Sequence, residues 1–162
     1  MEHNSALAST AFSASLALLA ACSLASCGGP SVAKAGPDGS AIEQVKAASA
    51  DWIASFNRGD VDGCVAAYHS DALMEAQPMG SFRGTAAIDG FWRPFIASGA
   101  SDLVYRNVRL EQVDERTVTL AAEWSMNVGR GVITEERWVR QDDGVWRLTF
   151  DAFEVQERFQ PQ

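Results

Sequence analysis

The sequence predicts an α+β domain in which three N-terminal helices pack against one antiparallel sheet. Between residues 40 and 98, apolar side chains recur mainly at the three- and four-residue spacing of amphipathic helices. After Gly99 the apolar period changes to two, which is typical of strands that bury one face. Helices followed by a run of strands are expected to gather on one side of a sheet.

The first helix is predicted to begin at Ser40, because Ser40 and Glu43 match the S-x-x-E capping box. Gly59 ends this helix, since glycine readily takes the left-handed conformation that follows a helix. Asp60 caps a short second helix, and a third runs from Thr85 to about residue 98. The apolar residues behind these assignments are Ile42, Val45, Trp52, Ile53 and Phe56 in the first helix, Val61, Val65 and Tyr68 in the second, and Ile88, Phe91, Trp92 and Phe95 in the third.

The strands are predicted from alternation and from the turn residues between them. A short strand is expected at residues 72–76, followed by a loop rich in proline and glycine over residues 78–84. Longer strands are expected at residues 103–113 and 117–127, with a turn at Gly129-Arg130-Gly131.

The last two strands form the clearest local pattern of the chain. Residues 132–141 and 145–155 are both rich in β-branched and aromatic side chains, and Asp142-Asp143-Gly144 separates them. Asp-Gly between two such runs predicts a β-hairpin, because glycine takes positive φ without steric cost.

The final strand contains one irregularity. Trp146, Leu148 and Phe150 share a face, whereas Phe153 has the opposite parity. We therefore expect a β-bulge near Asp151-Ala152, which would turn Asp151 toward the interior.

Composition limits the classes of function. The chain has 162 residues, of which 47% are hydrophobic and 21% charged, so one domain with a substantial core is expected. A net charge of −8 argues against a nucleic-acid partner, which would need a basic surface. No apolar run of membrane-spanning length follows the N-terminal region, so no transmembrane helix is expected in the mature domain.

The N-terminus is typical of a secretory signal. Residues 11–21, AFSASLALLAA, form a short apolar segment that ends in small residues, although no Lys or Arg precedes it. Cys22 follows Leu-Ala-Ala, and Cys27 follows Leu-Ala-Ser; both sites resemble the bacterial lipobox, in which the cysteine becomes the lipidated first residue. The alternative is that these residues form an N-terminal helix of the protein.

These features divide the chain into four parts. Residues 1–27 are assigned to a signal peptide with cleavage before Cys22 or Cys27, and residues 28–39 to a flexible tether. Residues 40–158 form the folded domain, and 159–162 a tail. The predicted location is the bacterial cell envelope, with the lipid anchor holding the protein to a membrane.

The order of motifs within residues 40–157 resembles the nuclear-transport-factor-2-like superfamily, and within it the SnoaL-like and ketosteroid-isomerase-like proteins. The motifs are Asn57-Arg58-Gly59-Asp60, Ala67-Tyr68, Ser70-Asp71-Ala72, Gly84-x-x-Ala87-Ile88-x-x-Phe91-Trp92, and Asp143-Gly144-x-Trp146-Arg147-Leu148. The resemblance implies a cone-shaped, strongly curved sheet around a pocket that the helices close. Relatives include isomerases, cyclases, dehydratases and proteins that only bind or dimerise, so the fold alone does not fix function.

The resemblance also argues against steroid-type isomerisation. In ketosteroid isomerases a general-base Asp follows the first strand, just before a Pro. Here the matching position is Ala76 or Gln77, before Pro78, and neither residue titrates. We therefore expect a cavity without the acid that these isomerases use.

Three titratable residues are catalytic candidates. Asp151 is the first to test, because the expected bulge could turn it toward the pocket. Glu136 either lines the pocket mouth or pairs with neighbours on the solvent face. His69 is a general base or simply solvates a helix end. No metal site is predicted, because His69 has no partner at ligand spacing, and no cofactor motif is present.

Aromatic content predicts an apolar pocket. Most of these side chains must form the core, and a subset is expected to line a cavity. The residues expected to bind a ligand are Trp52, Phe56, Tyr68, Met74, Phe91, Trp124 and Asp151.

Three functional hypotheses follow. The leading one is a lipid-anchored domain that binds a small apolar or amphipathic molecule, or a protein partner, without catalysis. The second is an enzyme in which a pocket carboxylate transfers a proton on a small organic substrate. The third is a structural homodimer module, which would fill the cone and expose an apolar sheet face.

Overall fold

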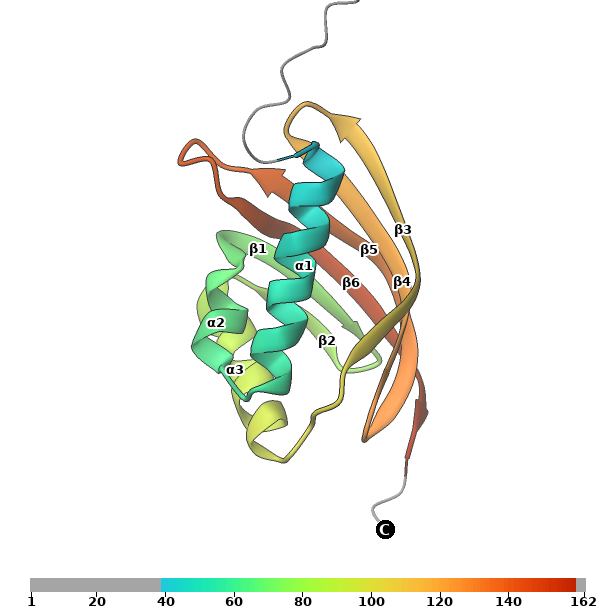
Figure 1. The fold of residues 1–162 in the computed structure, drawn as a ribbon. Helices are drawn as coiled ribbons and strands as arrows, with labels where there is room; N and C mark the ends of the chain where they lie inside the picture. The colour runs from blue at the N-terminus through green and yellow to red at the C-terminus, as the bar shows by residue number, and fades with distance from the viewer. Residues whose placement is uncertain (1–38, 160–162) are drawn as a thin grey trace, which may run out of the picture. The chain divides into compact units, whose positions relative to one another are not determined.

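A computed structural model describes residues 39–159 as three helices and six strands (Figure 1). The helices are α1 (Ala41–Asn57), α2 (Val61–Ala66) and α3 (Thr85–Ala97). The strands are β1 (Tyr68–Gln77), β2 (Gly80–Arg83), β3 (Val104–Asp114), β4 (Thr117–Met126), β5 (Gly129–Arg140) and β6 (Trp146–Arg158). The predicted signal peptide, the lipidation candidates Cys22 and Cys27 and nearly all of the tether lie outside these residues.

The helix boundaries follow from the predicted capping residues. The side chain of Ser40 accepts a hydrogen bond from the Glu43 backbone N–H at 3.3 Å, and Asp60 accepts one from the Gly63 N–H at 2.9 Å. Both bonds satisfy donors that have no partner within the first turn of a helix. Gly59 adopts a φ of 74° between α1 and α2, as the turn requires.

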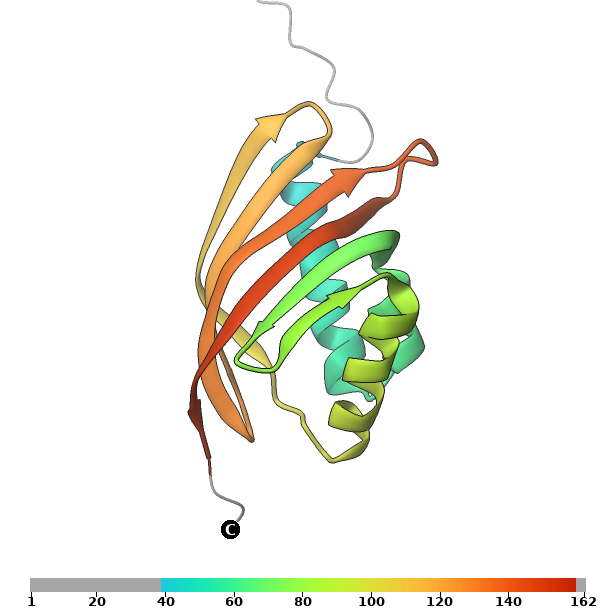
Figure 2. The same ribbon diagram turned by 180° about the vertical axis from the view of Figure 1, so that it is seen from behind.

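The strands form one curved sheet in the order β2-β1-β6-β5-β4-β3. All neighbours are antiparallel except β1 and β6, which run parallel. Figures 1 and 2 show α1 lying across one face of this sheet, with α2 and α3 beside its β1–β2 end. The α+β class and the curved sheet with three helices are therefore confirmed.

Several boundaries differ from the sequence-based expectation. β1 begins at Tyr68, which was expected at the end of the second helix, because the residues from Tyr68 onward pair with β6. β2 occupies residues expected to form a loop; a strand of four residues is too short to show a period. Gly129 and Gly131, expected in a turn, belong to β5, where the close approach of β6 leaves no room for a side chain.

The expected bulge in the last strand lies two residues earlier than predicted. Arg137 pairs with Phe150 and Trp138 pairs with Leu148, so the additional residue of β6 is Thr149. Phe150 consequently leaves the face shared by Trp146 and Leu148 and lies under the Arg137 guanidinium, 5.3 Å from its ring centre. The consequence for Asp151 is the one expected, because Asp151 is buried on the inner face.

The core lies between α1 and the inner face of the sheet. Fully buried side chains include Val45 and Phe56 of α1 and Val118, Leu120 and Trp138 of β4 and β5. Asn57 also fastens α1 to the segment before β3: its side-chain amide donates to the Leu103 carbonyl at 2.9 Å and accepts from the Leu103 N–H at 2.7 Å. Within residues 39–159, no helix has both the length and the apolarity needed to cross a membrane.

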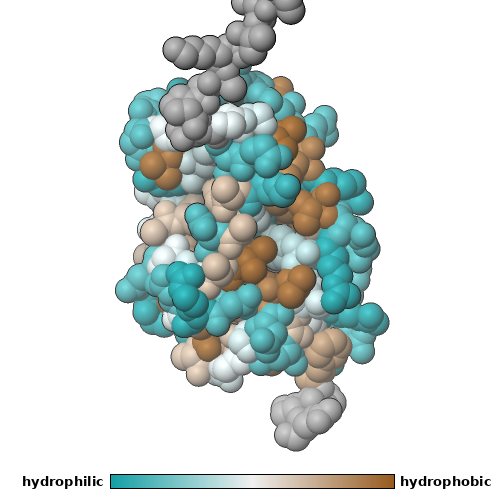
Figure 3. Space-filling view, in the orientation of Figure 1, coloured by the Kyte–Doolittle hydropathy of each residue, from teal (hydrophilic) through white to brown (hydrophobic). Residues whose placement is uncertain are grey.

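The edge strand β3 carries the most exposed apolar residues of the sheet. Val104, Val108 and Val113 are 46%, 45% and 60% exposed. Figure 3 shows apolar side chains gathered on the side of the domain along which β3 runs. Whether two copies associate through the sheet stays a prediction.

Candidate functional site

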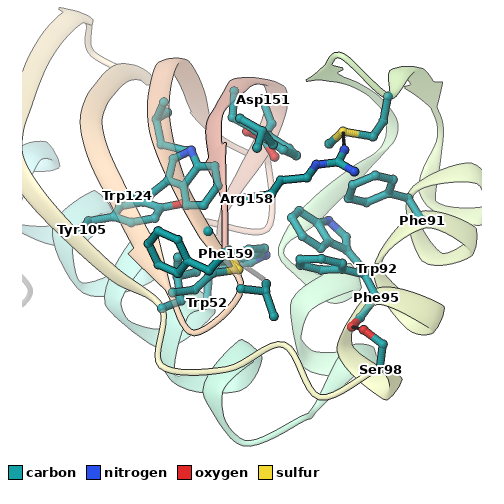
Figure 4. A pocket seen from close by; sticks show the side chains of 18 residues that line it. Trp52, Phe91, Trp92, Phe95, Ser98, Tyr105, Trp124, Asp151, Arg158 and Phe159 are labelled. Atoms are coloured by element: carbon teal, nitrogen blue, oxygen red, sulfur yellow. Dashed lines mark hydrogen bonds between the residues drawn. The ribbon is translucent and has the colours of Figure 1, made fainter. Parts of the chain in front are cut away.

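A cavity of about 460 Å³ lies between the helices and the inner face of the sheet (Figure 4). This volume is within the usual range for small-molecule sites, roughly 300–1,000 Å³. The residues lining the cavity are Trp52, Met79, Phe91, Trp92, Phe95, Ser98, Leu103, Tyr105, Trp124, Met126, Val128, Gly129, Ile133, Asp151, Phe153, Val155, Arg158 and Phe159. Most are apolar, and Asp151 is the one carboxylic acid in this lining.

One wall of the cavity is aromatic and comes from the helices. Figure 4 shows Phe91, Trp92 and Phe95 of α3 side by side on it. The ring centres of Trp92 and Trp52 of α1 are 5.4 Å apart, and Trp92 stacks on Phe153 of β6 at 5.8 Å. Such contacts fix the ring orientations, so the wall is rigid and complementary to flat apolar molecules.

The opposite wall comes from the sheet. Tyr105 of β3 and Trp124 of β4 are directly paired, and Gly131 of β5 is the partner of Trp124 on its other side. A Cβ atom at Gly131 would lie only 2.7 Å from Cζ2 of Trp124. The absence of a side chain at residue 131 therefore allows the Trp124 indole to approach β5 closely.

Asp151 places a carboxyl group on this mostly apolar lining. Its side chain is only 4% exposed, and the Tyr68 hydroxyl donates a hydrogen bond to Oδ2 at 2.6 Å. Trp92 Nε1 donates in turn to the Tyr68 hydroxyl at 3.2 Å. Burial raises the pKa of Asp151 to about 6, although the hydrogen bond from Tyr68 opposes this rise.

Glu136 is a second buried carboxyl group, and it lies directly opposite Asp151 in the β5–β6 pairing. It is 3% exposed, and it accepts hydrogen bonds from the Tyr105 hydroxyl at 2.9 Å and from Trp138 Nε1 at 2.8 Å. Burial and the nearby Asp151 raise the pKa of Glu136 to about 8.

The alternative that Glu136 lies on the solvent face is therefore wrong. A bulge at Thr134 shifts the parity of β5, because Ile133 pairs with Phe153 and Glu135 pairs with Ala152. Glu135 and Arg137 instead form the ion pair of the outer face. Glu136 stands behind Tyr105 and is not part of the cavity lining.

The seven residues predicted to bind a ligand divide into two groups. Those that line the cavity are Trp52, Phe91, Trp124 and Asp151. Those that lie in the core outside the lining are Phe56, Tyr68 and Met74. Tyr68 still acts on the site, because it holds the Asp151 carboxyl group in place.

His69 lies away from the cavity. It is half-buried on β1, and its Nδ1 accepts a hydrogen bond from the Asp71 backbone N–H at 3.2 Å. Among residues 39–159, no cluster of three or more His, Cys, Asp or Glu side chains is arranged to hold a metal ion.

Sequence reasoning missed three polar residues of the cavity, Ser98, Tyr105 and Arg158. Tyr105 links the lining to Glu136, and Arg158 lies at its exposed edge, where it contacts the Met79 sulfur at 3.4 Å. The sequence around Tyr105 predicts a strand. The contact of Tyr105 with Glu136, however, depends on how β3, β4 and β5 pair, which the sequence does not show. Nothing in the sequence shows that the end of β6 reaches this lining.

Comparison with known proteins identifies the family. Residues 50–155, about two thirds of the chain, match the SnoaL-like domain. The chain belongs to the SnoaL-like domain family. No curated protein matches the sequence of this SnoaL-like protein.

Solved structures share the fold of this SnoaL-like domain at low sequence identity. A ketosteroid isomerase-like protein from Erwinia carotovora is 12% identical, with a TM-score of 0.62 over 72% of this chain and 96% of that one. An NTF2-like protein of unknown function from Pseudomonas putida is 14% identical, with a TM-score of 0.62 over 70% and 85%. A protein of unknown function from Pectobacterium atrosepticum is 17% identical, with a TM-score of 0.62 over 72% and 91%.

The cavity of this SnoaL-like domain contains a carboxylic acid, but not at the position that ketosteroid isomerases use. At the end of β1, Ala76 is buried and Gln77 is exposed, so no acid occupies the position used by ketosteroid isomerases. The carboxyl group comes instead from Asp151 of β6, two strands from the edge of the sheet. A bulge in β6 directs Asp151 inward, and the sequence predicted such a bulge two residues later than the structure places it.

Proposed function

We propose that this SnoaL-like domain binds a small, mostly apolar organic molecule and transfers a proton to or from it through Asp151. The observation that carries the proposal is a buried carboxyl group at an apolar cavity, held by the Tyr68 hydroxyl at 2.6 Å. Of the sequence-based hypotheses, this geometry favours the pocket-carboxylate enzyme over the protein that only binds.

The protonation states of the two carboxyl groups support this role. With a pKa of about 6 for Asp151 and about 8 for Glu136, the pair holds one proton near pH 7, mainly on Glu136. Asp151 is then an ionised base in an apolar site, and a base is most effective when its pKa lies near the working pH. A neutral Glu136 adds no repulsion to the Asp151 carboxylate.

The test uses 5-nitrobenzisoxazole, a flat, apolar carbon acid. A carboxylate base removes its ring C–H proton as the N–O bond breaks, and the phenolate product absorbs visible light. We expect the rate to rise with pH through about 6 and to fall at least about a hundredfold in Asp151→Asn, which keeps the size and the hydrogen-bond acceptor. Glu75→Gln is the matched control, because Glu75 lies on β1 outside the cavity lining.

Binding without catalysis is the second candidate function, and the aromatic wall supports it. Calorimetry with the same compound separates the two functions. If the wild-type protein binds the compound but accelerates its reaction no more than Asp151→Asn does, the domain is a binding protein.

We also propose that the mature protein is lipid-anchored in a bacterial envelope, supported by the two lipobox-like sites at Cys22 and Cys27. Mass spectrometry of the N-terminus after expression of the full chain in a bacterium tests this. A diacylglyceryl group on one of the two cysteines is expected, and Cys22→Ser and Cys27→Ser variants identify which. An intact Met1 would contradict the anchor.

A further inference from the structure

Two residues that line the cavity carry a hydrogen-bond donor with no partner among residues 39–159. The indole Nε1 atoms of Trp52 and Trp124 are buried and unpaired among residues 39–159. The two residues are 5% and 6% exposed, and both line the cavity. Buried donors of this kind are rare in folded proteins, because leaving one unpaired is costly.

Three other donors of the lining already have partners. Trp92 donates to Tyr68, Tyr105 donates to Glu136, and the Ser98 hydroxyl donates to the Phe95 carbonyl at 2.6 Å. The unpaired indoles also differ from Trp146, which is 7% exposed and donates to Gln44 Oε1 at 2.7 Å. Unpaired indoles therefore occur in this part of the chain only where they line the cavity.

The two unpaired indoles and Arg158 are all hydrogen-bond donors. An indole N–H only donates, and so does the guanidinium of Arg158 at the exposed edge of the cavity. A hydrocarbon would leave both indoles unpaired, and an ammonium group could pair with the Asp151 carboxylate but not with the indoles. An oxygen with free lone pairs satisfies them.

We propose that the ligand of this cavity is an oxygenated apolar molecule whose carbonyl or ether oxygen accepts a hydrogen bond from the indole N–H of Trp52 or Trp124. The proposal rests on the proposed function, because it assigns the ligand class of the same cavity. It adds that an acceptor oxygen, and not apolar surface alone, decides which molecules bind.

The test compares tetralin with 1-tetralone, two bicyclic molecules that differ by one carbonyl oxygen. Calorimetry gives the ratio of their dissociation constants for the wild type and for Trp52→Phe, Trp124→Phe and the control Trp146→Phe. We expect the preference for the ketone to fall by about fivefold to tenfold in Trp52→Phe or Trp124→Phe. A change of this size corresponds to the loss of one hydrogen bond. The preference should stay unchanged in Trp146→Phe, whose indole is paired outside the cavity.

A second measurement needs no variant that might unfold. In ¹H–¹⁵N spectra of the wild type, 1-tetralone should move the indole proton of Trp52 or Trp124 downfield, and tetralin should not. Suppose that both molecules bind, that the ratio of their dissociation constants is the same in all variants, and that both molecules shift the indole signals equally. The acceptor assignment is then wrong, and the binding site stands. If neither molecule binds, both proposals fall.

Discussion

Glu136 and Asp151 stand directly opposite each other on β5 and β6, and both are more than nine-tenths buried. Each carboxyl group accepts a hydrogen bond from a tyrosine, Tyr105 for Glu136 and Tyr68 for Asp151. The charge on Asp151 raises the pKa of Glu136, so the titrations of the two carboxyl groups are linked.

The first prediction concerns stability and pH. Both carboxyl groups have a native pKa above their value in the unfolded chain, so the native domain binds more protons between about pH 4 and pH 8. The free energy of unfolding should therefore decrease as pH rises across this window, by ~1.4 kcal/mol per pH unit for each additional proton held. Urea unfolding at a series of pH values measures the slope.

Glu136→Gln tests the origin of this slope. The variant cannot ionise, so the decrease above pH 6 should become shallower. Glu135→Gln is the matched control, because Glu135 lies next to it in sequence but pairs with Arg137 on the outer face. Equal slopes for the wild type and Glu136→Gln would contradict the assignment.

The second prediction concerns the tyrosine beside Asp151. Tyr68→Phe removes the hydroxyl that stabilises the ionised carboxyl group, so the pKa of Asp151 should rise above its wild-type value of about 6. Carbon-13 NMR titration of the Asp151 carboxyl group measures the change. In Tyr105→Phe the titration of Glu136 should move upward instead; an Asp151 midpoint that is unaffected by Tyr68→Phe would refute the prediction.

The third prediction concerns the glycine under Trp124. Gly131→Ala should destabilise the domain by about 2 kcal/mol or more, because its Cβ would meet both the indole and the backbone of β6. Gly90→Ala in α3 is the contrasting change: a Cβ there meets nothing within 4 Å, and alanine favours the helix by about 1 kcal/mol. Thermal unfolding should rank the two variants on opposite sides of the wild type.

The fourth prediction concerns Arg158 at the exposed edge of the cavity. Among residues 39–159 it forms no ion pair, and its partner is the sulfur of Met79. Arg158→Gln should weaken the binding of 2-naphthoate a few-fold and leave naphthalene unchanged, since an exposed charge pair is worth less than about 1 kcal/mol. Arg130→Gln is the control, because Arg130 pairs with Glu157 at 2.7 Å; equal losses in both variants would remove Arg158 from the site.

The sequence by itself determined the class of fold and most of its elements. The capping residues Ser40 and Asp60, the Asp143-Gly144 turn and the alternation in β4 act locally, so they can be recognised without knowing the rest of the chain. The same local rules predicted an irregularity in β6, because a change of parity is visible in the sequence.

Only the tertiary structure decided the chemistry of the cavity. Glu136 and Asp151 meet because single-residue bulges at Thr134 and Thr149 shift the pairing of β5 and β6. A shift of one residue moves every following side chain to the other face, and nothing local encodes the partner strand's register. Burial, which raises the pKa values of these two carboxyl groups, is likewise a property of the assembled layers and not of any segment. The same holds for the Trp52 and Trp124 indoles, which have no partner among residues 39–159.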